Sequence, residues 1–222
     1  MDQPGVDPLA HRQALAGLAR INRFSDSVGV FWSVIQEEAR KVSRPLRILD
    51  IGSGAGDVLL ALAKRASRRQ VPLELAGCDI SSTAVGFARQ QAERANAKID
   101  FFTLDVLNDP LPTDYDLLIS SLFLHHLETS QAEELLRRMG QATRRTLLIN
   151  DLARSRMNYF LVWIACHLLS RSPIVHFDGP VSVRAAFTPK EALQLARAAG
   201  LDGASVQTKF PCRFLLRWSK MS

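Results

Sequence analysis

The chain has 222 residues and a formal net charge of +6, and 47% of its residues are hydrophobic and 23% charged. This length and balance fit one globular domain with a full core and argue against an intrinsically disordered chain. The longest apolar stretch, residues 157–169, is shorter than the roughly 20 residues that span a bilayer, and the first residues lack the apolar run of a signal peptide.

The first two thirds of the chain alternate between strand and helix patterns. Residues 8–41 have helical spacing and end before Pro45, and the apolar run 46–51 is typical of a buried parallel strand. Glycines and an amphipathic helix over 57–69 follow, and then a strand over 72–78 that leads into Asp79. Either Ser81 or Ser82 can cap the next helix. Strands are expected at 99–104, 115–120 and 146–150.

Capping signals place the later helices. The spacing of Ser130 and Glu133 predicts a capping box for a helix from Gln131. Thr188 with Glu191 predicts a second box after a long insertion at 152–187. The last two strands, 204–209 and 212–218, are joined too closely for a parallel crossover and are expected to pair antiparallel.

These elements predict an α/β fold: a doubly wound, mostly parallel seven-stranded sheet with an antiparallel last strand and helices on both faces. We interpret residues 1–222 as a single domain. It is expected to comprise N-terminal helices (1–44), a ligand-binding core (45–151), a lid insertion after strand five (152–187), and a last helix with the antiparallel strand pair (188–222). Ligands of such sheets bind at the carboxyl ends of the strands.

The stretch from Asp50 to Gly56 reads Asp-Ile-Gly-Ser-Gly-Ala-Gly and lies between a buried strand and a helix. Glycines there allow a tight turn and close approach of a ligand to the backbone. The dinucleotide fingerprint G-x-G-x-x-G would need its third glycine at Asp57. Because an acid at a helix N-terminus disfavours a pyrophosphate, we expect a ligand without phosphates, and not NAD.

This stretch resembles the first motif, Asp/Glu-x-Gly-x-Gly-x-Gly, of the Rossmann-like (class I) S-adenosylmethionine-dependent methyltransferases. The resemblance is close over residues 46–151 and looser elsewhere. It implies S-adenosylmethionine as cofactor and S-adenosylhomocysteine as product. The overall pattern looks most similar to the small-molecule branch with the ubiquinone and menaquinone biosynthesis and type-11 methyltransferases.

The resemblance assigns roles to residues at the strand ends. Asp50 would orient the methionine end, Asp79 would bind the two ribose hydroxyls, and Asp105 would contact the adenine amino group. Each of these acids could instead cap a helix. The full set of expected cofactor contacts is Asp50, Gly52, Ser53, Gly54, Gly56, Asp79, Ile80, Asp105, Val106, Ser120 and Ser121.

Catalytic candidates follow strands four and five. His125 and His126 are suited to removing a proton from a hydroxyl acceptor, or they shape the pocket, and Asp151 is expected to line the acceptor site. No metal is expected. Metal-dependent catechol-type enzymes place an acid after strand four, where this chain has serine, and Mg²⁺ prefers an octahedron of oxygen ligands.

The insertion and the charge distribution bear on the acceptor. Residues 152–187 predict a helix with apolar residues on nearly every side. This segment is therefore expected to be part of the core, a lid over a lipophilic acceptor, or a surface that inserts into a membrane interface. As a lid it would present Phe160, Trp163 or Ile164 to the acceptor. From residue 152 onward the chain has ten lysines and arginines and three acidic residues, which gives this part a net charge of +7. Such a surface solubilises the chain, or it meets an anionic substrate, an acidic carrier protein, a membrane or nucleic acid.

The sequence thus predicts methyl transfer to a small, lipophilic or phenolic acceptor at a hydroxyl. Methylation of carbon, methylation of RNA and a non-catalytic cofactor-binding domain remain as alternatives. RNA is disfavoured because amino-directed nucleic-acid methyltransferases resemble one another in an Asn/Asp-Pro-Pro-Tyr/Phe motif after strand four. This chain has Ser-Ser-Leu-Phe there, at residues 120–123. The scattered cysteines, Cys78, Cys166 and Cys212, indicate a reducing compartment, and we expect a cytoplasmic protein with peripheral membrane contact as a further option.

Overall fold

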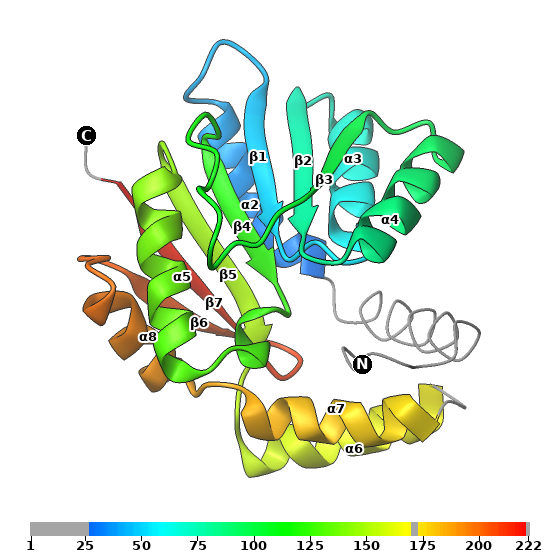
Figure 1. Ribbon diagram of the computed structural model, residues 1–222, viewed down its shortest axis with the longest axis vertical. Helices are drawn as coiled ribbons and strands as arrows, with labels where there is room; N and C mark the ends of the chain where they lie inside the picture. The colour runs from blue at the N-terminus through cyan, green and yellow to red at the C-terminus, as the bar shows by residue number, and fades with distance from the viewer. Residues whose placement is uncertain (1–26, 170–172, 221–222) are drawn as a thin grey trace.

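Seven strands form one sheet in the order β3-β2-β1-β4-β5-β7-β6 (Figure 1). The computed structural model describes residues 27–169 and 173–220, so the first part of the helix expected at 8–41 lies outside the described residues. Strands β1 to β5 pair in parallel, and β7 runs antiparallel to both β5 and β6. The expected mostly parallel sheet with an antiparallel last strand is confirmed.

The strands match the apolar runs of the sequence closely. They are β1 (Leu46–Ile51), β2 (Leu73–Asp79), β3 (Ile99–Thr103), β4 (Leu117–Ser121), β5 (Thr146–Leu152), β6 (Ser205–Lys209) and β7 (Arg213–Ser219). The central strands β1, β4 and β5 are buried almost throughout, as expected where both faces of a parallel sheet are covered.

Helices cover both faces of the sheet. They are α2 (Ser27–Ala39), α3 (Asp57–Arg69), α4 (Ser82–Arg94), α5 (Thr129–Ala142), α6 (Arg156–Leu169), α7 (Pro173–Ala185) and α8 (Pro189–Ala198), with a short 3₁₀ helix, η1 (Leu124–His126). One core cluster joins α2, α3 and α4 to the sheet, and a second joins α5 and α8 to it. Of the two predicted cap residues for α4, Ser81 is the one used: its hydroxyl accepts from the Ala84 N–H at 3.2 Å.

Two details of the expected elements differ. The capping box predicted at Ser130 and Glu133 is wrong: α5 begins at Thr129, and the box is formed by Glu128 and Gln131. The Glu128 N–H donates to Gln131 Oε1 at 3.0 Å. The reason is that the chain leaves η1 in an extended conformation that ends at Glu128, so Ser130 already lies within the first turn. The box at Thr188 and Glu191 is confirmed.

Strand β5 is longer than predicted because its partner continues. Leu152 pairs with Arg213 at the start of β7, which extends the ladder past Asn150. Asp151 therefore lies inside the strand rather than after it.

The insertion forms a helical hairpin of α6 and α7. The two helices pack against each other, and α7 also contacts η1. The hairpin lies beyond the carboxyl ends of the parallel strands and not over either helix-covered face (Figure 1). This is the edge at which α/β sheets bind ligands. Within the described residues, no helix is long and apolar enough to cross a membrane.

Candidate active site

The glycine loop between β1 and α3 has a left-handed backbone at all three glycines, with φ of 68° at Gly52, 51° at Gly54 and 78° at Gly56. Two of them are also packed. A Cβ at Gly52 would lie 2.6 Å from the Phe123 ring, and one at Gly56 would lie 2.7 Å from the Phe101 ring. At Gly54 nothing lies within 4 Å of that position. The loop thus presents an open, side-chain-free surface at Gly54 where a ligand can approach the backbone.

The end of β2 holds this loop. The Ser53 N–H donates to the Cys78 carbonyl at 2.9 Å. The Asp79 carboxylate accepts from the Gly54 N–H at 2.9 Å through Oδ2 and from the Ser81 N–H at 2.9 Å through Oδ1. Asp79 therefore fixes the loop and the start of α4 together. Because a carboxylate oxygen has two lone pairs, each oxygen keeps one acceptor site for a ligand.

The next residue, Ile80, leaves its side chain 67% exposed at the same edge. This exposed side chain offers an apolar surface beside the Asp79 carboxylate.

Asp50 is the most unusual group of the loop. It is 2% exposed, and its Oδ1 is buried without a hydrogen-bond partner, as is the hydroxyl of neighbouring Ser53. Burial, and then the charge of Asp79, raise the pKa of Asp50 well above its usual value. A buried acceptor without a donor costs free energy, so this arrangement fits a ligand that brings a donor or positive charge.

Asp105 has local partners. Its carboxylate accepts from the Leu107 N–H at 3.0 Å and from the Asn108 side-chain amide at 2.8 Å. These bonds, the Asn108 side chain first, lower the pKa of Asp105. Val106 is buried in the core cluster below α5. Asp105 thus closes the turn after β3 and does not cap a helix, and its expected adenine contact stays a prediction.

The two serines after β4 are engaged in the sheet edge. The buried Ser120 hydroxyl donates to the Ile51 carbonyl at 2.8 Å, and the Asn150 amide donates to the Ser121 hydroxyl at 3.2 Å. Leu122 follows with a left-handed φ of 57°. The Ser120 side chain is therefore structural, and the expected ligand role of this segment stays a prediction.

His125 and Asp151 are brought together from β5 and the turn after β4. His125 Nδ1 lies 2.6 Å from Asp151 Oδ1, and the two residues are 8% and 1% exposed. Asp151 also accepts from the Leu152 N–H at 2.6 Å and the His125 N–H at 3.3 Å. Burial acts to raise the pKa of Asp151, but the charge of His125 and these hydrogen bonds outweigh it, and the pKa lies below its usual value.

The protonation of His125 Nδ1 follows from its partner. An ionised carboxylate only accepts hydrogen bonds, so Nδ1 carries a proton, and the neutral form of this ring has its lone pair on Nε2. This is the arrangement of a general base oriented by a carboxylate. The ring centroid of His126 lies 4.2 Å from that of His125, but His126 is exposed whereas His125 is buried. The structure therefore distinguishes the two histidines, which the sequence did not.

A buried arginine, which no local pattern in the sequence indicates, lies near this pair. Arg213, at the start of β7, is 4% exposed. Burial lowers the pKa of Arg213 to about 10, against the effects of the charges of Asp151 and Cys212. Only the antiparallel register of β5 and β7, which the sequence does not encode locally, reveals this neighbour.

The expected acceptor residues lie on α6. Phe160 and Trp163 are 56% and 44% exposed with their rings stacked at a centroid distance of 6.4 Å, and Ile164 is partly exposed. The contact with the His125 turn is made by α7. The hairpin therefore lies at the carboxyl edge of the sheet, where ligands are expected. The contact of these three side chains with an acceptor stays a prediction.

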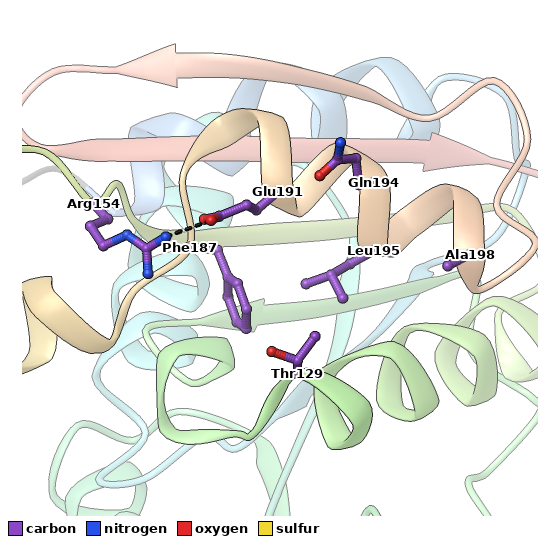
Figure 2. Close-up of a pocket in the computed structure, with 7 residues that line it drawn as sticks. All are labelled: Thr129, Arg154, Phe187, Glu191, Gln194, Leu195 and Ala198. Atoms are coloured by element: carbon purple, nitrogen blue, oxygen red, sulfur yellow. Dashed lines mark hydrogen bonds and ion pairs between the residues drawn. The ribbon is translucent and has the colours of Figure 1, made fainter.

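A pocket of about 320 Å³ lies between α5 and α8. Figure 2 shows Phe187, Leu195 and Thr129 pointing into it, with the Arg154–Glu191 ion pair at one side. None of its lining residues comes from the glycine loop or from β2, so it is separate from the expected cofactor site. Among the residues that the structure describes, no group of three or more His, Cys, Asp or Glu side chains could hold a metal ion.

Residues 48–146 match the protein family described as "Methyltransferase domain". With the sheet order and the glycine loop above, this match agrees with the suspected family. Residues 48–146 carry a methyltransferase domain.

The methyltransferase domain is similar to a curated protein at the sequence level. Over 79 residues it is 35% identical to the release factor glutamine methyltransferase of Haemophilus influenzae. The aligned segment covers 34% of this chain and 27% of that protein. The chain thus matches about a quarter of the length of this relative.

Solved structures share the fold of the methyltransferase domain over most of the chain. The plantazolicin methyltransferase BpumL, in complex with S-adenosylhomocysteine and a monoazolic desmethyl analogue, is 20% identical with a TM-score of 0.69; 95% of this chain and 88% of that chain are covered. An O-methyltransferase family 2 protein from Planctomyces limnophilus, in complex with apigenin, is 16% identical with a TM-score of 0.67. The latter match covers 100% of this chain and 64% of that chain.

Proposed function

We propose that this protein transfers a methyl group from S-adenosylmethionine to a hydroxyl of a small lipophilic or phenolic acceptor. The observation that carries the proposal is the glycine loop at the carboxyl edge: open at Gly54, bordered by Asp79, and lined by a buried Asp50 oxygen without a donor. The match of residues 48–146 to a methyltransferase domain supports it.

The residues of the loop fit S-adenosylmethionine. The Asp79 carboxylate has acceptor sites left for a ribose diol, and Ile80 offers an apolar surface for an adenine ring. The Asp79 carboxylate and the buried Asp50 oxygen without a donor suit a cationic ligand that carries no phosphate. When bound, S-adenosylmethionine supplies an electrophilic methyl group on a sulfonium and leaves as S-adenosylhomocysteine.

His125 is the base in this proposal. As the acceptor oxygen forms its bond to the methyl group and the sulfur–methyl bond breaks, the hydroxyl proton passes to His125 Nε2. Asp151 holds Nδ1–H and stabilises the imidazolium that forms. The α6–α7 hairpin limits the access of water, which would compete for the acceptor site.

The acceptor class follows from the surroundings of the site. The hairpin beyond the sheet edge is rich in exposed apolar side chains, which favours an acceptor with apolar area. The structural neighbour bound to apigenin, a phenol, agrees with this reading. The Ser120–Phe123 segment lacks the Pro-Pro pair, which argues against an amino group of a nucleic acid.

The proposal is tested by measuring S-adenosylhomocysteine production with phenols and aliphatic alcohols, with 1,3-dicarbonyl carbon acceptors, and with RNA. Turnover is expected with a hydroxyl acceptor. His125→Gln should lower the rate by about 10²- to 10⁴-fold, the usual worth of a general base. His126→Gln, its exposed neighbour, is the matched comparison and should have a far smaller effect. Turnover with carbon acceptors or RNA alone, or full activity of His125→Gln, would contradict the proposal.

A further inference from the structure

Exposed large apolar side chains are confined to one end of the described part of the molecule. Nine such residues are exposed there, and five lie on α6 and two on α7. The other two, Ile80 and Phe210, follow β2 and precede β7 and so lie at the same carboxyl edge of the sheet. The seven on the hairpin are Met157, Phe160, Leu161, Trp163, Leu168, Phe177 and Val181.

The outer face of α6 is apolar along the length of the helix. Met157, Phe160, Leu161 and Leu168 follow the i, i+3, i+4, i+11 spacing that places them on one side, and partly exposed Ile164 completes the stripe at i+7. We call these five residues the α6 stripe. The opposite side of α6 is packed against α7, where Cys166 is 1% exposed and leaves no room for a Cβ at Gly179. The stripe is therefore not the inner face of the hairpin, and in the proposal below Phe160 and Ile164 face lipid rather than the acceptor.

The hairpin and its flanks carry positive charge. Residues 153–187 contain four arginines, one aspartate and no glutamate, and α6 has no acidic residue; one of the four, Arg154, is paired with Glu191 of α8. Arg156 is exposed at the start of α6, and Arg184 of α7 lies over the Tyr159 ring at 5.2 Å. An apolar stripe within a basic surface is complementary to a membrane surface, where acyl chains lie below anionic headgroups. Trp163, half exposed beside the stripe, is a residue that favours this interface.

We propose that the α6–α7 hairpin docks on an anionic lipid surface, with the α6 stripe inserted among the headgroups and Arg156 and Arg184 facing the phosphates. α6 then lies in the plane of the membrane surface and does not cross it. The hairpin contacts the His125 turn through α7, so docking places the carboxyl edge of the sheet against the bilayer. A lipophilic acceptor could reach that edge without passing through water. Docking itself is independent of methyl transfer, so it is measured without cofactor or acceptor.

The test is cosedimentation of the full chain with vesicles of phosphatidylcholine alone and of phosphatidylcholine with 30% phosphatidylglycerol. We expect binding to the anionic vesicles that weakens at high salt, because exposed charges are screened. The double variant Leu161→Ser/Leu168→Ser should lower that binding at least tenfold. Phe210→Ser removes a 92% exposed apolar ring at the same edge but outside the hairpin, so it should lower the binding less than the double variant does.

Two further measurements distinguish lipid binding by the stripe from a folding defect of the double variant and from other occupants of the stripe. Because the replaced side chains are exposed, the melting temperature and the calorimetric affinity for S-adenosylmethionine should match those of the wild type. Equal binding to both kinds of vesicle, or full binding of the double variant, would overturn the proposal. Absence of vesicle binding would overturn it too. In that case ultracentrifugation decides between the other occupants. If the wild type is a dimer and the double variant is a monomer, the stripe binds a second copy of the chain. If the wild type is a monomer, the stripe is assigned to another segment of this chain.

Discussion

His125 Nδ1 and Asp151 Oδ1 lie 2.6 Å apart at the carboxyl edge of the sheet, buried between η1, β5 and the α6–α7 hairpin. Neither residue is close to the other in sequence. The parallel pairing of β4 with β5 places their carboxyl ends side by side, and the turn after β4 then brings the imidazole onto the carboxylate. The pair gives the proposed reaction an oriented proton acceptor.

Asp151→Asn should slow transfer more than it perturbs cofactor binding. An amide in place of the carboxylate cannot stabilise an imidazolium and no longer fixes the Nδ1–H tautomer, so we expect a loss of about 10²-fold or more in kcat. The affinity for S-adenosylmethionine, measured by calorimetry, should change less than threefold, because the expected cofactor contacts come from other loops. An equal loss in kcat and in cofactor affinity would show that Asp151 only holds the sheet edge together.

Asp50 should make the ligand-free protein less stable as the pH rises. Its pKa is raised in the folded state, so between the unfolded value near 4 and the folded value the folded state holds a proton that the unfolded state has lost. The free energy of unfolding then falls with rising pH in that window and is constant again above the folded pKa.

Asp50→Asn should remove this pH dependence. At neutral pH we expect the variant to be more stable by about 1 kcal/mol, or about 2–4 °C in Tm for a chain of this size, and to bind S-adenosylmethionine more weakly. Thermal melts at pH 4, 5.5 and 7 give the measurement. A variant that is destabilised by the same amount at all three values would contradict the assignment of Asp50 as a strained ligand-facing acid.

Asp79 has both a structural and an expected ligand role, and two variants separate them. Asp79→Ala should weaken S-adenosylmethionine binding by about 1.5–3 kcal/mol, the usual contribution of hydrogen bonds to a charged group. Ser81→Ala removes only the cap of α4 and should cost about 1 kcal/mol of stability while leaving the affinity nearly intact. If both variants lower stability and neither lowers the affinity, Asp79 is a helix cap and no more.

Much of the fold could be predicted because its signals are local. The apolar run of β1, the helix from Asp57 and the Thr188–Glu191 box each depend on neighbouring residues, and all three lie where the sequence places them. The glycine loop could be predicted for the same reason, since its three left-handed positions are every second residue of one short segment.

The parts that could not be predicted depend on residues far apart. The cap of α5 is set by where η1 ends and not by the Ser130 spacing, and the length of β5 is set by β7. Both histidines were candidates for the base because only the tertiary pairing with Asp151 distinguishes His125 from His126. The packing of the α6–α7 hairpin was likewise ambiguous, since α6 is apolar on both sides and its pattern does not say which side packs on α7.

The affinity of the Gly54 loop for S-adenosylmethionine tests the central claim most directly. Calorimetry should show that the wild type binds S-adenosylmethionine and S-adenosylhomocysteine and does not bind NAD. Gly54→Val should abolish this binding, because its branched side chain fills the open surface of the loop. Gly203→Val is the matched control, since Gly203 also has a positive φ and open surroundings but lies before β6, and it should bind like the wild type. Binding of NAD without binding of S-adenosylmethionine, or undiminished binding by Gly54→Val, would contradict the account.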